Sequence, residues 1–388
     1  MRKAIILFAA FALTACSARA LLSEDVVRSE MVRCPEASYI DGLEGKLKWN
    51  YTTGLELKAM LDAAGADALD YVDAWYDAII DSTGRIGVNY KKSNFSLDHI
   101  CPGRTLFSLY DLTGKEKYRA AMDSLYAQIL DQPRTRKGGF WHKKIYPDQM
   151  WLDGLYMAQP FYAEYTARYV PDSLKARNFE DIARQFDLAW IGCYDTATGL
   201  LRHAWDASRS MFWCDPATGQ SAHAWGRAMG WYAMALVEVI PWMPEGALKL
   251  DLTEKLDKLC HNIMSYADPE SRMWYQVLDR PGDKGNYLEA TVGAMFSYAL
   301  LKGCRNGWVK GIKIETARAI YRDFLRTFVS YDQSTGLVNL DRCCEVAGLG
   351  GKENRSGTYD YYINEKIRSN DPKGIGPLVW AALEYEKL

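Results

Sequence analysis

Apolar residues recur at helical spacing along most of the chain, in two kinds of segment. Residues 225–236 are apolar around most of a helix circumference, whereas residues 115–130 and 254–266 keep one charged face. A helix that is apolar on most sides must be buried, and a helix with a charged face can form an outer layer. The pattern therefore predicts an all-α protein built from inner and outer helices.

Six segments that are rich in small and aromatic residues are candidates for the inner helices. They begin near Tyr51, Asp98, Trp151, Ala224, Tyr287 and Gly374. Each interval of roughly 50 to 85 residues can hold a helix, a turn and a second helix, as repeat architectures require. Six such pairs closing into a ring give an (α/α)6 barrel, a six-hairpin toroid. An open helical array is the alternative that the periodicity leaves open.

A turn motif recurs between the helical segments, at residues 81–84, 195–199 and 332–336. Each copy begins with aspartate, ends with glycine and is followed by short apolar or β-prone residues. The aspartate side chain caps the local backbone and glycine accepts positive φ. The motif predicts short hairpins at the barrel mouth. No Pro/Ser-rich linker interrupts residues 40–388, which we expect to form a single catalytic domain.

The first residues predict export. Residues 1–15 combine two positive charges, a short apolar stretch and small residues, which is typical of a lipoprotein signal peptide. The ending Leu13-Thr14-Ala15-Cys16 resembles a lipobox, so we expect Cys16 to be lipidated and residues 16–39 to form a tether. A chance cysteine after an ordinary signal peptide is the alternative. Because Ser17 follows rather than an acidic residue, we expect an outer-membrane lipoprotein facing the periplasm.

Composition and charge exclude several classes of function. The 388 residues are 48% hydrophobic, enough for one large core, and the net charge of −2 offers no field for a nucleic acid. The cysteines lack C-x-x-C spacing, the five histidines lack H-x-x-x-H spacing, and there is no phosphate loop or G-x-S-x-G elbow. We expect no metal, no cofactor, membrane contact only through the lipid anchor, and a monomer or weak homodimer.

Aromatic residues and one carboxylate point to carbohydrate chemistry. The chain has 13 tryptophans and 25 tyrosines, concentrated where inner helices are expected to begin, and aromatic faces stack on sugar rings. The segment Trp151-Leu-Asp153-Gly154 places one carboxylate among apolar residues. Burial raises a carboxyl pKa, so Asp153 is a candidate proton donor. A plain helix-capping role for Asp153 is the alternative.

Three further positions could complete such a site. Asp98 begins another inner segment, so its carboxylate is expected at the same mouth as Asp153; capping is again the alternative. Two neighbouring carboxyl groups push their titrations apart, so that one donates a proton while the other stays anionic. Arg227 and Trp231 lie one helical turn apart and suit an acidic sugar, unless Arg227 is paired internally.

Two loops supply histidines. His142 and Lys143 follow one glycine-rich turn, and His203 follows the second copy of the turn motif. Loops at a barrel mouth collect ligand contacts, and histidine can hydrogen-bond hydroxyl groups or polarise water near neutral pH. These residues are therefore candidates for substrate binding.

The combination of motifs resembles the unsaturated rhamnogalacturonyl hydrolases of glycoside hydrolase family 105 over roughly residues 40–385. The matching segments are Trp49-Asn-Tyr51, Leu97-Asp98 with Pro102-Gly-Arg104, Gly139-Phe-Trp-His142-Lys143, Gln149-Met-Trp-Leu-Asp153-Gly154, Leu201-Arg-His203-Ala-Trp-Asp206, Trp225-Gly-Arg227-Ala-Met-Gly-Trp231 and Asn370-Asp-Pro-Lys-Gly-Ile-Gly-Pro377. The Trp-Leu-Asp-Gly and Trp-Gly-Arg-x-x-Gly-Trp segments are specific. The resemblance implies an (α/α)6 barrel that releases a terminal 4,5-unsaturated uronate from lyase-generated pectin oligosaccharides.

The resemblance also implies roles for individual residues. Asp153 would protonate C4 of the double bond and activate the water that adds at C5, with Asp98 beside it. The residues expected to hold the unsaturated ring and its carboxylate are Tyr51, His142, Lys143, Trp151, His203, Arg227 and Trp231. Two alternatives stay open, namely the same chemistry on unsaturated glucuronides of other polysaccharides, and a non-catalytic, sugar-binding lipoprotein.

Overall fold

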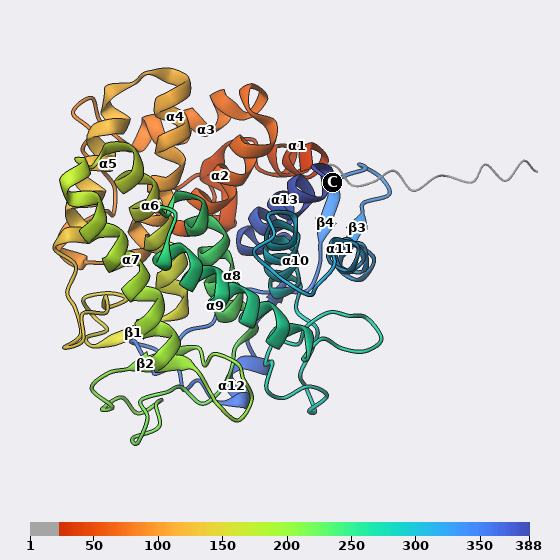
Figure 1. The fold of residues 1–388 in the computed structure, drawn as a ribbon. Helices are drawn as coiled ribbons and strands as arrows, with labels where there is room; N and C mark the ends of the chain where they lie inside the picture. Colours follow the sequence, from red (N-terminus) through yellow and green to blue (C-terminus); the bar gives the residue numbers. More distant parts are fainter. Residues whose placement is uncertain (1–22) are drawn as a thin grey trace, which may run out of the picture.

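The computed structural model describes residues 23–388, in which helices form two concentric layers (Figure 1). The inner layer consists of α2 (Tyr51–Ala64), α4 (Thr105–Thr113), α6 (Leu152–Tyr169), α8 (Gly226–Val239), α10 (Ala290–Arg305) and α13 (Pro372–Glu386). The outer layer consists of α1 (Ser23–Arg33), α3 (Ala66–Ile79), α5 (Glu116–Leu130), α7 (Asp172–Cys193), α9 (Ala247–Met264) and α11 (Ile314–Phe328). A short helix, α12 (Tyr359–Ile363), precedes α13.

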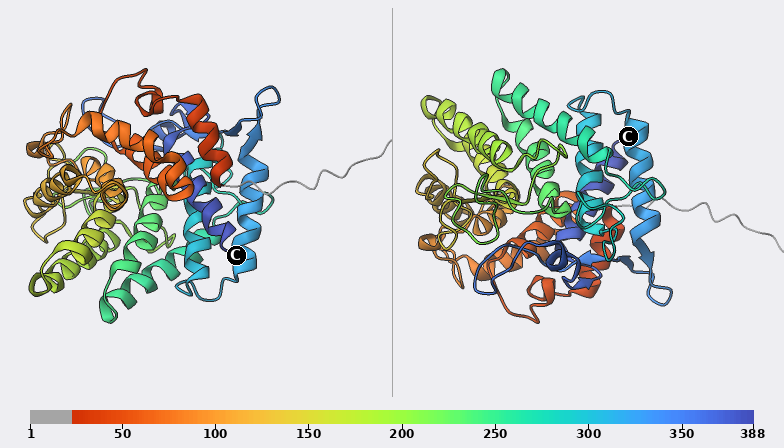
Figure 2. Two further views of the ribbon diagram at one scale, coloured as in Figure 1. Left: turned by 90° about the horizontal axis from the view of Figure 1, so that it is seen from above. Right: turned by 90° about the horizontal axis from the view of Figure 1, so that it is seen from below.

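The inner helices close into a ring. α6 packs against α8, α8 against α10, and α10 against α13, which returns to α2; the turns before α4 lie between α2 and α6. Figure 2 shows the same circuit, with the last helix, in dark blue, beside the first helices, in red and orange. The (α/α)6 barrel is therefore confirmed, and the open array is wrong.

Burial of whole helices explains the inner layer. Every residue of α8 except Glu238 is buried, as the apolar pattern of residues 225–236 predicts. α8 and α10 also approach closely, because a Cβ on Gly230 would lie 2.5 Å from the sulfur of Met295. Glycine at this position lets the two inner helices touch.

Three antiparallel strand pairs lie at the barrel mouth, the end where the inner helices begin. They are β1 (Gln149–Trp151) with β2 (Ala204–Asp206), β3 (Val329–Tyr331) with β4 (Val338–Leu340), and β5 (Cys343–Cys344) with β6 (Ile367–Arg368). The hairpin β3–β4 closes over residues 332–336, one of the predicted turns. The other two pairs join segments that are far apart in sequence.

Two sequence-based boundaries are wrong. Residues 16–39 were expected to form a tether, yet Ser23–Arg33 is helix α1, whose Val26 and Val27 are buried against α13 and α2. The inner helix expected near Asp98 instead begins at Thr105. Residues 97–104 form two 3-10 turns, because Pro102 cannot donate a backbone hydrogen bond.

The predicted signal peptide and the lipidation site Cys16 lie outside the described residues. Within residues 23–388, none of the helices is sufficiently long and apolar to span a bilayer.

Candidate active site

Strand pairing brings the candidate proton donor, Asp153, to a buried histidine. Trp151 of β1 lies opposite Ala204 of β2, and the Leu152 amide donates to the His203 carbonyl at 3.1 Å. As a result, Asp153 in the first turn of α6 has its Oδ2 atom 3.3 Å from His203 Nε2. The capping residue of α6 is Trp151, and among residues 23–388 no side chain caps this helix, so the alternative role of Asp153 as a helix cap is wrong.

The contact between Asp153 and His203 leaves hydrogen-bonding capacity free. The two groups are not aligned for a hydrogen bond to each other. Among residues 23–388, neither Asp153 Oδ2 nor His203 Nε2 has any other hydrogen-bond partner. The other ring nitrogen of His203 lies 2.7 Å from the hydroxyl of Tyr362, on α12. The Tyr362 contact thus orients an imidazole whose second nitrogen faces the carboxyl group.

Asp98 has a different environment, because two basic side chains lie next to its carboxylate. Its carboxylate lies 2.5 Å from Lys143 Nζ and 3.4 Å from His142 Nε2. Burial works to raise the pKa of Asp98, but the charges of Lys143 and His142 outweigh burial and hold this pKa below its usual range. Burial also lowers the pKa of His142 to about 4. At neutral pH, Asp98 is therefore an anion beside an uncharged imidazole.

Trp151 holds His142 in place. The two rings stack with centroids 4.7 Å apart and planes 9° from parallel, and Tyr146 stacks on Trp151 at 4.9 Å. A Cβ on Gly154 would lie 3.0 Å from His142 Nδ1, so glycine after Asp153 makes room for the imidazole. Trp151 is buried, and its indole N–H donates to Gln149 Oε1 at 3.1 Å. Its contact with a sugar stays a prediction.

Tyr51 connects the two halves of the site. Burial raises the pKa of Tyr51 well above its usual value, the nearby Asp98 carboxylate raises it further, and Arg227 opposes this effect. Asp98, Asp153 and Arg227 therefore all lie close enough to Tyr51 to influence its hydroxyl group.

Arg227 and Trp231 lie deeper than the sequence indicated. Arg227 is 1% exposed; its guanidinium donates to the carbonyls of Cys344 and Glu345 and lies 3.7 Å from Glu289 Oε1. The internal pairing considered for Arg227 is therefore present, although its Nε atom has no hydrogen-bond partner within residues 23–388. Trp231 is buried behind Tyr51, with ring centroids 6.3 Å apart. Their contact with substrate stays a prediction.

Comparison with known proteins places this geometry in a family. The family model described as Glycosyl Hydrolase Family 88 matches residues 22–388. The chain belongs to this family. A family 105 glycoside hydrolase of C. acetobutylicum is 40% identical, covers 94% of this chain and 99% of its own, and superposes with a TM-score of 0.88. The resemblance to family 105 is thus confirmed.

Other relatives of this family 88 glycoside hydrolase match in part. Protein Atu3128 of Agrobacterium fabrum is 38% identical over 234 residues, which is 59% of this chain and 97% of that protein. The unsaturated rhamnogalacturonyl hydrolase YesR of Bacillus subtilis is 28% identical over 221 residues, 53% of this chain and 58% of that protein. An unsaturated glucuronyl hydrolase specific for heparin covers 94% of this chain and 96% of its own, with a TM-score of 0.64; at 12% identity it shows the fold alone.

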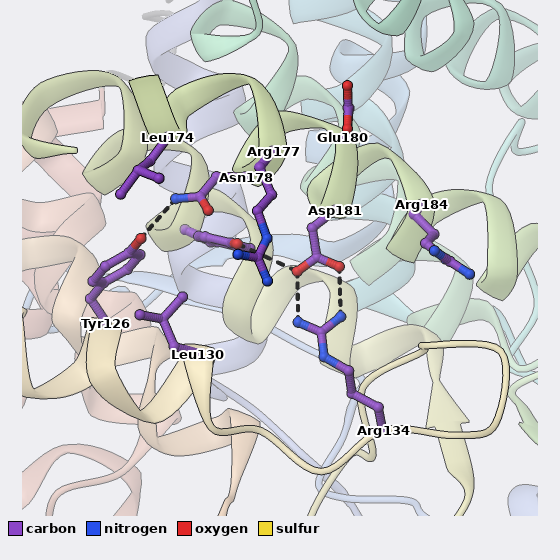
Figure 3. Close-up of a pocket in the computed structure, with 10 residues that line it drawn as sticks. Tyr126, Leu130, Arg134, Leu174, Arg177, Asn178, Glu180, Asp181 and Arg184 are labelled. Carbon is purple, nitrogen blue, oxygen red and sulfur yellow. Dashed lines mark hydrogen bonds and ion pairs between the residues drawn. The ribbon is translucent and has the colours of Figure 1, made fainter. Parts of the chain in front are cut away.

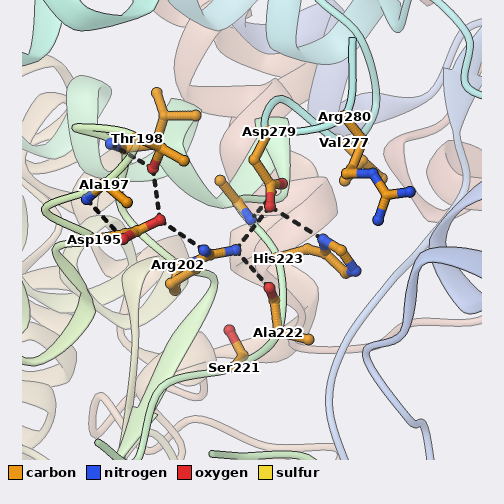
Figure 4. Close-up of polar contacts among 12 residues, drawn as sticks. Asp195, Ala197, Thr198, Arg202, Ser221, Ala222, His223, Val277, Asp279 and Arg280 are labelled. Carbon is orange, nitrogen blue, oxygen red and sulfur yellow. Dashed lines mark hydrogen bonds and ion pairs between the residues drawn. The ribbon is translucent and has the colours of Figure 1, made fainter. Parts of the chain in front are cut away.

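A polar network that the sequence did not reveal supports His203 in this family 88 protein. Arg202 lies between Asp195, at 2.6 Å, and Asp279, at 2.7 Å, and His223 contacts the same oxygen of Asp279 at 3.1 Å (Figure 4). The His223 carbonyl accepts the backbone N–H of His203 at 3.1 Å. The network therefore fixes the segment that carries His203, directly before β2. Asp279 lies 77 residues from Arg202, and no local pattern signals that contact.

Two other contacts at the mouth were also missed. Tyr362 lies 159 residues from His203, and Arg355 donates to the Tyr146 hydroxyl at 3.0 Å while lying over Trp151. The aromatic run at residues 359–362 was the available signal for Tyr362.

A hollow of about 560 Å³ between α5 and α7 lies away from this site (Figure 3). None of the predicted site residues lines it. Both terminal nitrogens of Arg134 bond to the Asp181 carboxylate across it, at 2.6 and 2.8 Å. Arg134 is therefore paired with a carboxylate, and Arg177 and Arg184 also line the hollow. Within residues 23–388, no group of three histidine, cysteine or acidic side chains is placed to hold a metal ion.

Proposed function

We propose that this family 88 glycoside hydrolase removes a terminal 4,5-unsaturated uronate from lyase-generated oligosaccharides. Asp153 donates a proton to C4 of the double bond, and the resulting carboxylate takes a proton from the water that adds at C5. The hemiketal formed at C5 opens by breaking the bond between C5 and the ring oxygen, which takes the hydroxyl proton. The hemiacetal left at C1 then breaks its bond to the glycosidic oxygen, which takes the proton of the C1 hydroxyl and leaves with the remaining sugar. Each turnover consumes one water molecule and leaves Asp153 in its starting form.

The observation that carries this proposal is the contrast between the two carboxyl groups. Asp98 is held as an anion by Lys143 at 2.5 Å, so it is a poor proton donor and suits the orientation of water or substrate. Asp153 Oδ2 has no hydrogen-bond partner among the described residues and faces the imidazole of His203 at 3.3 Å. Asp153 is therefore the carboxyl group that is available to exchange a proton with substrate.

The similarity to the rhamnogalacturonyl hydrolase of Bacillus subtilis supports rhamnogalacturonan oligosaccharides as the substrate class. Tyr51, His142, Lys143, His203 and Arg227 would bind the unsaturated ring and its carboxylate, with Trp151 and Trp231 shaping the pocket. For location, we propose outer-membrane anchoring through Cys16, supported by the lipobox-like residues 13–16 and by Ser17.

Loss of the near-ultraviolet absorbance of an unsaturated rhamnogalacturonan disaccharide measures the reaction directly. Asp153→Asn keeps the size of the side chain but cannot donate the proton, so kcat/KM is expected to fall about a thousandfold. Asp172→Asn is the matched control, because that carboxylate is 95% exposed on the outer helix α7, and its rate should equal that of the wild type. Wild-type speed in Asp153→Asn contradicts the assignment. No turnover by the wild-type protein, combined with binding of saturated oligosaccharides, favours a sugar-binding protein instead.

A further inference from the structure

Three loops at the barrel mouth carry a pair of lysines each. The loops are residues 44–48, 89–95 and 142–148. Together they contain six lysines but only two acidic residues, Glu44 and Asp148. The lysines, which we term the lysine rim, are Lys46, Lys48, Lys91, Lys92, Lys143 and Lys144. The first and third loops lie just before α2 and α6, and the second lies just before the turn that holds Asp98.

These loops lie side by side. The Trp49 amide donates to the side-chain oxygen of Asn89 at 2.8 Å, and the Asn89 side chain donates back to the Trp49 carbonyl at 3.0 Å. The Lys144 amide donates to the Asn94 carbonyl at 3.1 Å. The lysine rim is therefore one continuous surface along one side of the mouth.

Most of the positive charge on the rim has no counter-ion. Lys143 pairs with Asp98, and Lys92 pairs with Asp131 at 2.7 Å. The other four lysines are exposed and form no ion pair with any of residues 23–388. They are Lys46, Lys48, Lys91 and Lys144. Many lysines elsewhere on the surface do form such pairs, as Lys115 does with Asp73 and Lys255 with Asp251.

The rim borders the catalytic groups and also a hollow. Burial lowers the pKa of His99, the neighbour of Asp98, and both Lys143 and Lys48 add to this lowering against the opposing effect of Asp98. Lys91 and Lys92, together with Arg85 and Tyr90, line a hollow of about 370 Å³ against α5. Positive charge thus extends from Lys143, beside Asp98, to the hollow that is lined by Tyr90.

We propose that the lysine rim binds a carboxylate of the sugar chain beyond the residue that is released. The substrate favoured by this site is then an unsaturated oligosaccharide with at least one further uronate. This inference rests on the proposed function, since it concerns the same substrate. Each exposed ammonium contributes little alone, but several act on one carboxylate, and their effect is screened by salt.

The test compares kcat/KM for an unsaturated disaccharide, which has one carboxylate, with that for a tetrasaccharide that has a second uronate. At low ionic strength we expect the tetrasaccharide to be favoured roughly tenfold, and this ratio should fall in about 0.5 M salt. A tetrasaccharide whose second carboxylate is a methyl ester should behave like the disaccharide. Lys48→Gln/Lys91→Gln/Lys144→Gln should bring the ratio close to that of the ester.

Lys310→Gln/Lys313→Gln is the matched control, because both lysines are exposed near the start of α11, and its ratio should equal that of the wild type. A wild-type ratio of about one, or a tenfold ratio that survives in the rim variant, overturns the inference while leaving the proposed function intact. If the wild type turns over neither substrate, the proposed function fails instead. The rim is then tested by titration with saturated uronate tetrasaccharide, and equal affinity in wild type and rim variant overturns it.

Discussion

The buried imidazole of His142 makes stability depend on pH. Its pKa lies at about 4 in the folded chain because of burial, against an ordinary value of 6.5. Between these values the unfolded chain binds a proton that the folded chain does not, so the free energy of unfolding falls as the pH is lowered. The expected loss from this group is about 2 kcal/mol between pH 7 and pH 4.5.

Urea unfolding at both pH values measures this loss, and His142→Asn should reduce the difference by that amount. His261→Asn, at an imidazole on α9 that is 49% exposed, is the matched control and should keep the wild-type difference. An unchanged difference in His142→Asn would show that the imidazole is not buried in its neutral form.

Individual residues of the site were predictable where their chemistry is local. Asp153 stands in a short apolar motif, and His142, Lys143 and His203 follow turn signals, so their positions at the mouth could be inferred. The depth of Arg227 could not be inferred, because its partner Glu289 lies just before another inner helix, α10. Hydrophobic spacing predicts which face of a helix is buried, but it does not say which polar group meets which.

At the scale of elements, the network around Asp279 ties the segment that carries His203, directly before β2, to the loop before α10. Burial works to raise the pKa of Asp279, but contacts with His223 and Arg202 hold it below its usual range, so its charge is part of the network. Asp279→Asn should cost about 2 kcal/mol of folding free energy and should also lower kcat several-fold, because His203 loses its support.

The matched control for this prediction is Glu384→Gln, which removes a buried carboxylate from its pair with Arg305 near the last residues of α13, at the end of the helix away from the mouth. Chemical unfolding and kcat are measured for both variants. The control should lose stability but keep kcat, and equal kcat in the two variants would show that the network has no influence on His203.

The sequence predicted inner helices better than it predicted their contacts. Five of the six inner helices begin within three residues of the expected positions, because small and aromatic residues mark their starts. The exception is α4. It begins only after the 3-10 turns that contain Asp98 and Pro102, so Asp98 still lies at the mouth. Pairing of β1 with β2 could not be foreseen, since two long helices separate these strands.

At the scale of the whole molecule, the two ends of the chain supply the sixth inner and outer pair. α13 is the last inner helix, and α1 lies against it as its outer partner. The Ser23 amide and hydroxyl both donate to the Glu386 carboxylate, at 2.6 and 3.0 Å. In the sequence, α1 lies more than three hundred residues from α13, so no local pattern predicts their contact, and the predicted tether over residues 16–39 is wrong from Ser23 onwards.

If α1 is an integral part of the barrel, a charge on its inner face must disrupt the fold. Val26 is completely buried and Val32 is 58% exposed on the same helix, so Val26→Asp and Val32→Asp introduce the same charge into opposite environments. Val26→Asp should cost roughly 3 kcal/mol or more, because an unpaired carboxylate is buried, and Val32→Asp should change stability by less than about 0.5 kcal/mol. Urea unfolding of the two full-length variants measures both values. Equal stability would mean that residues 23–33 do not close the ring, and that the sixth pair of helices lacks its outer member.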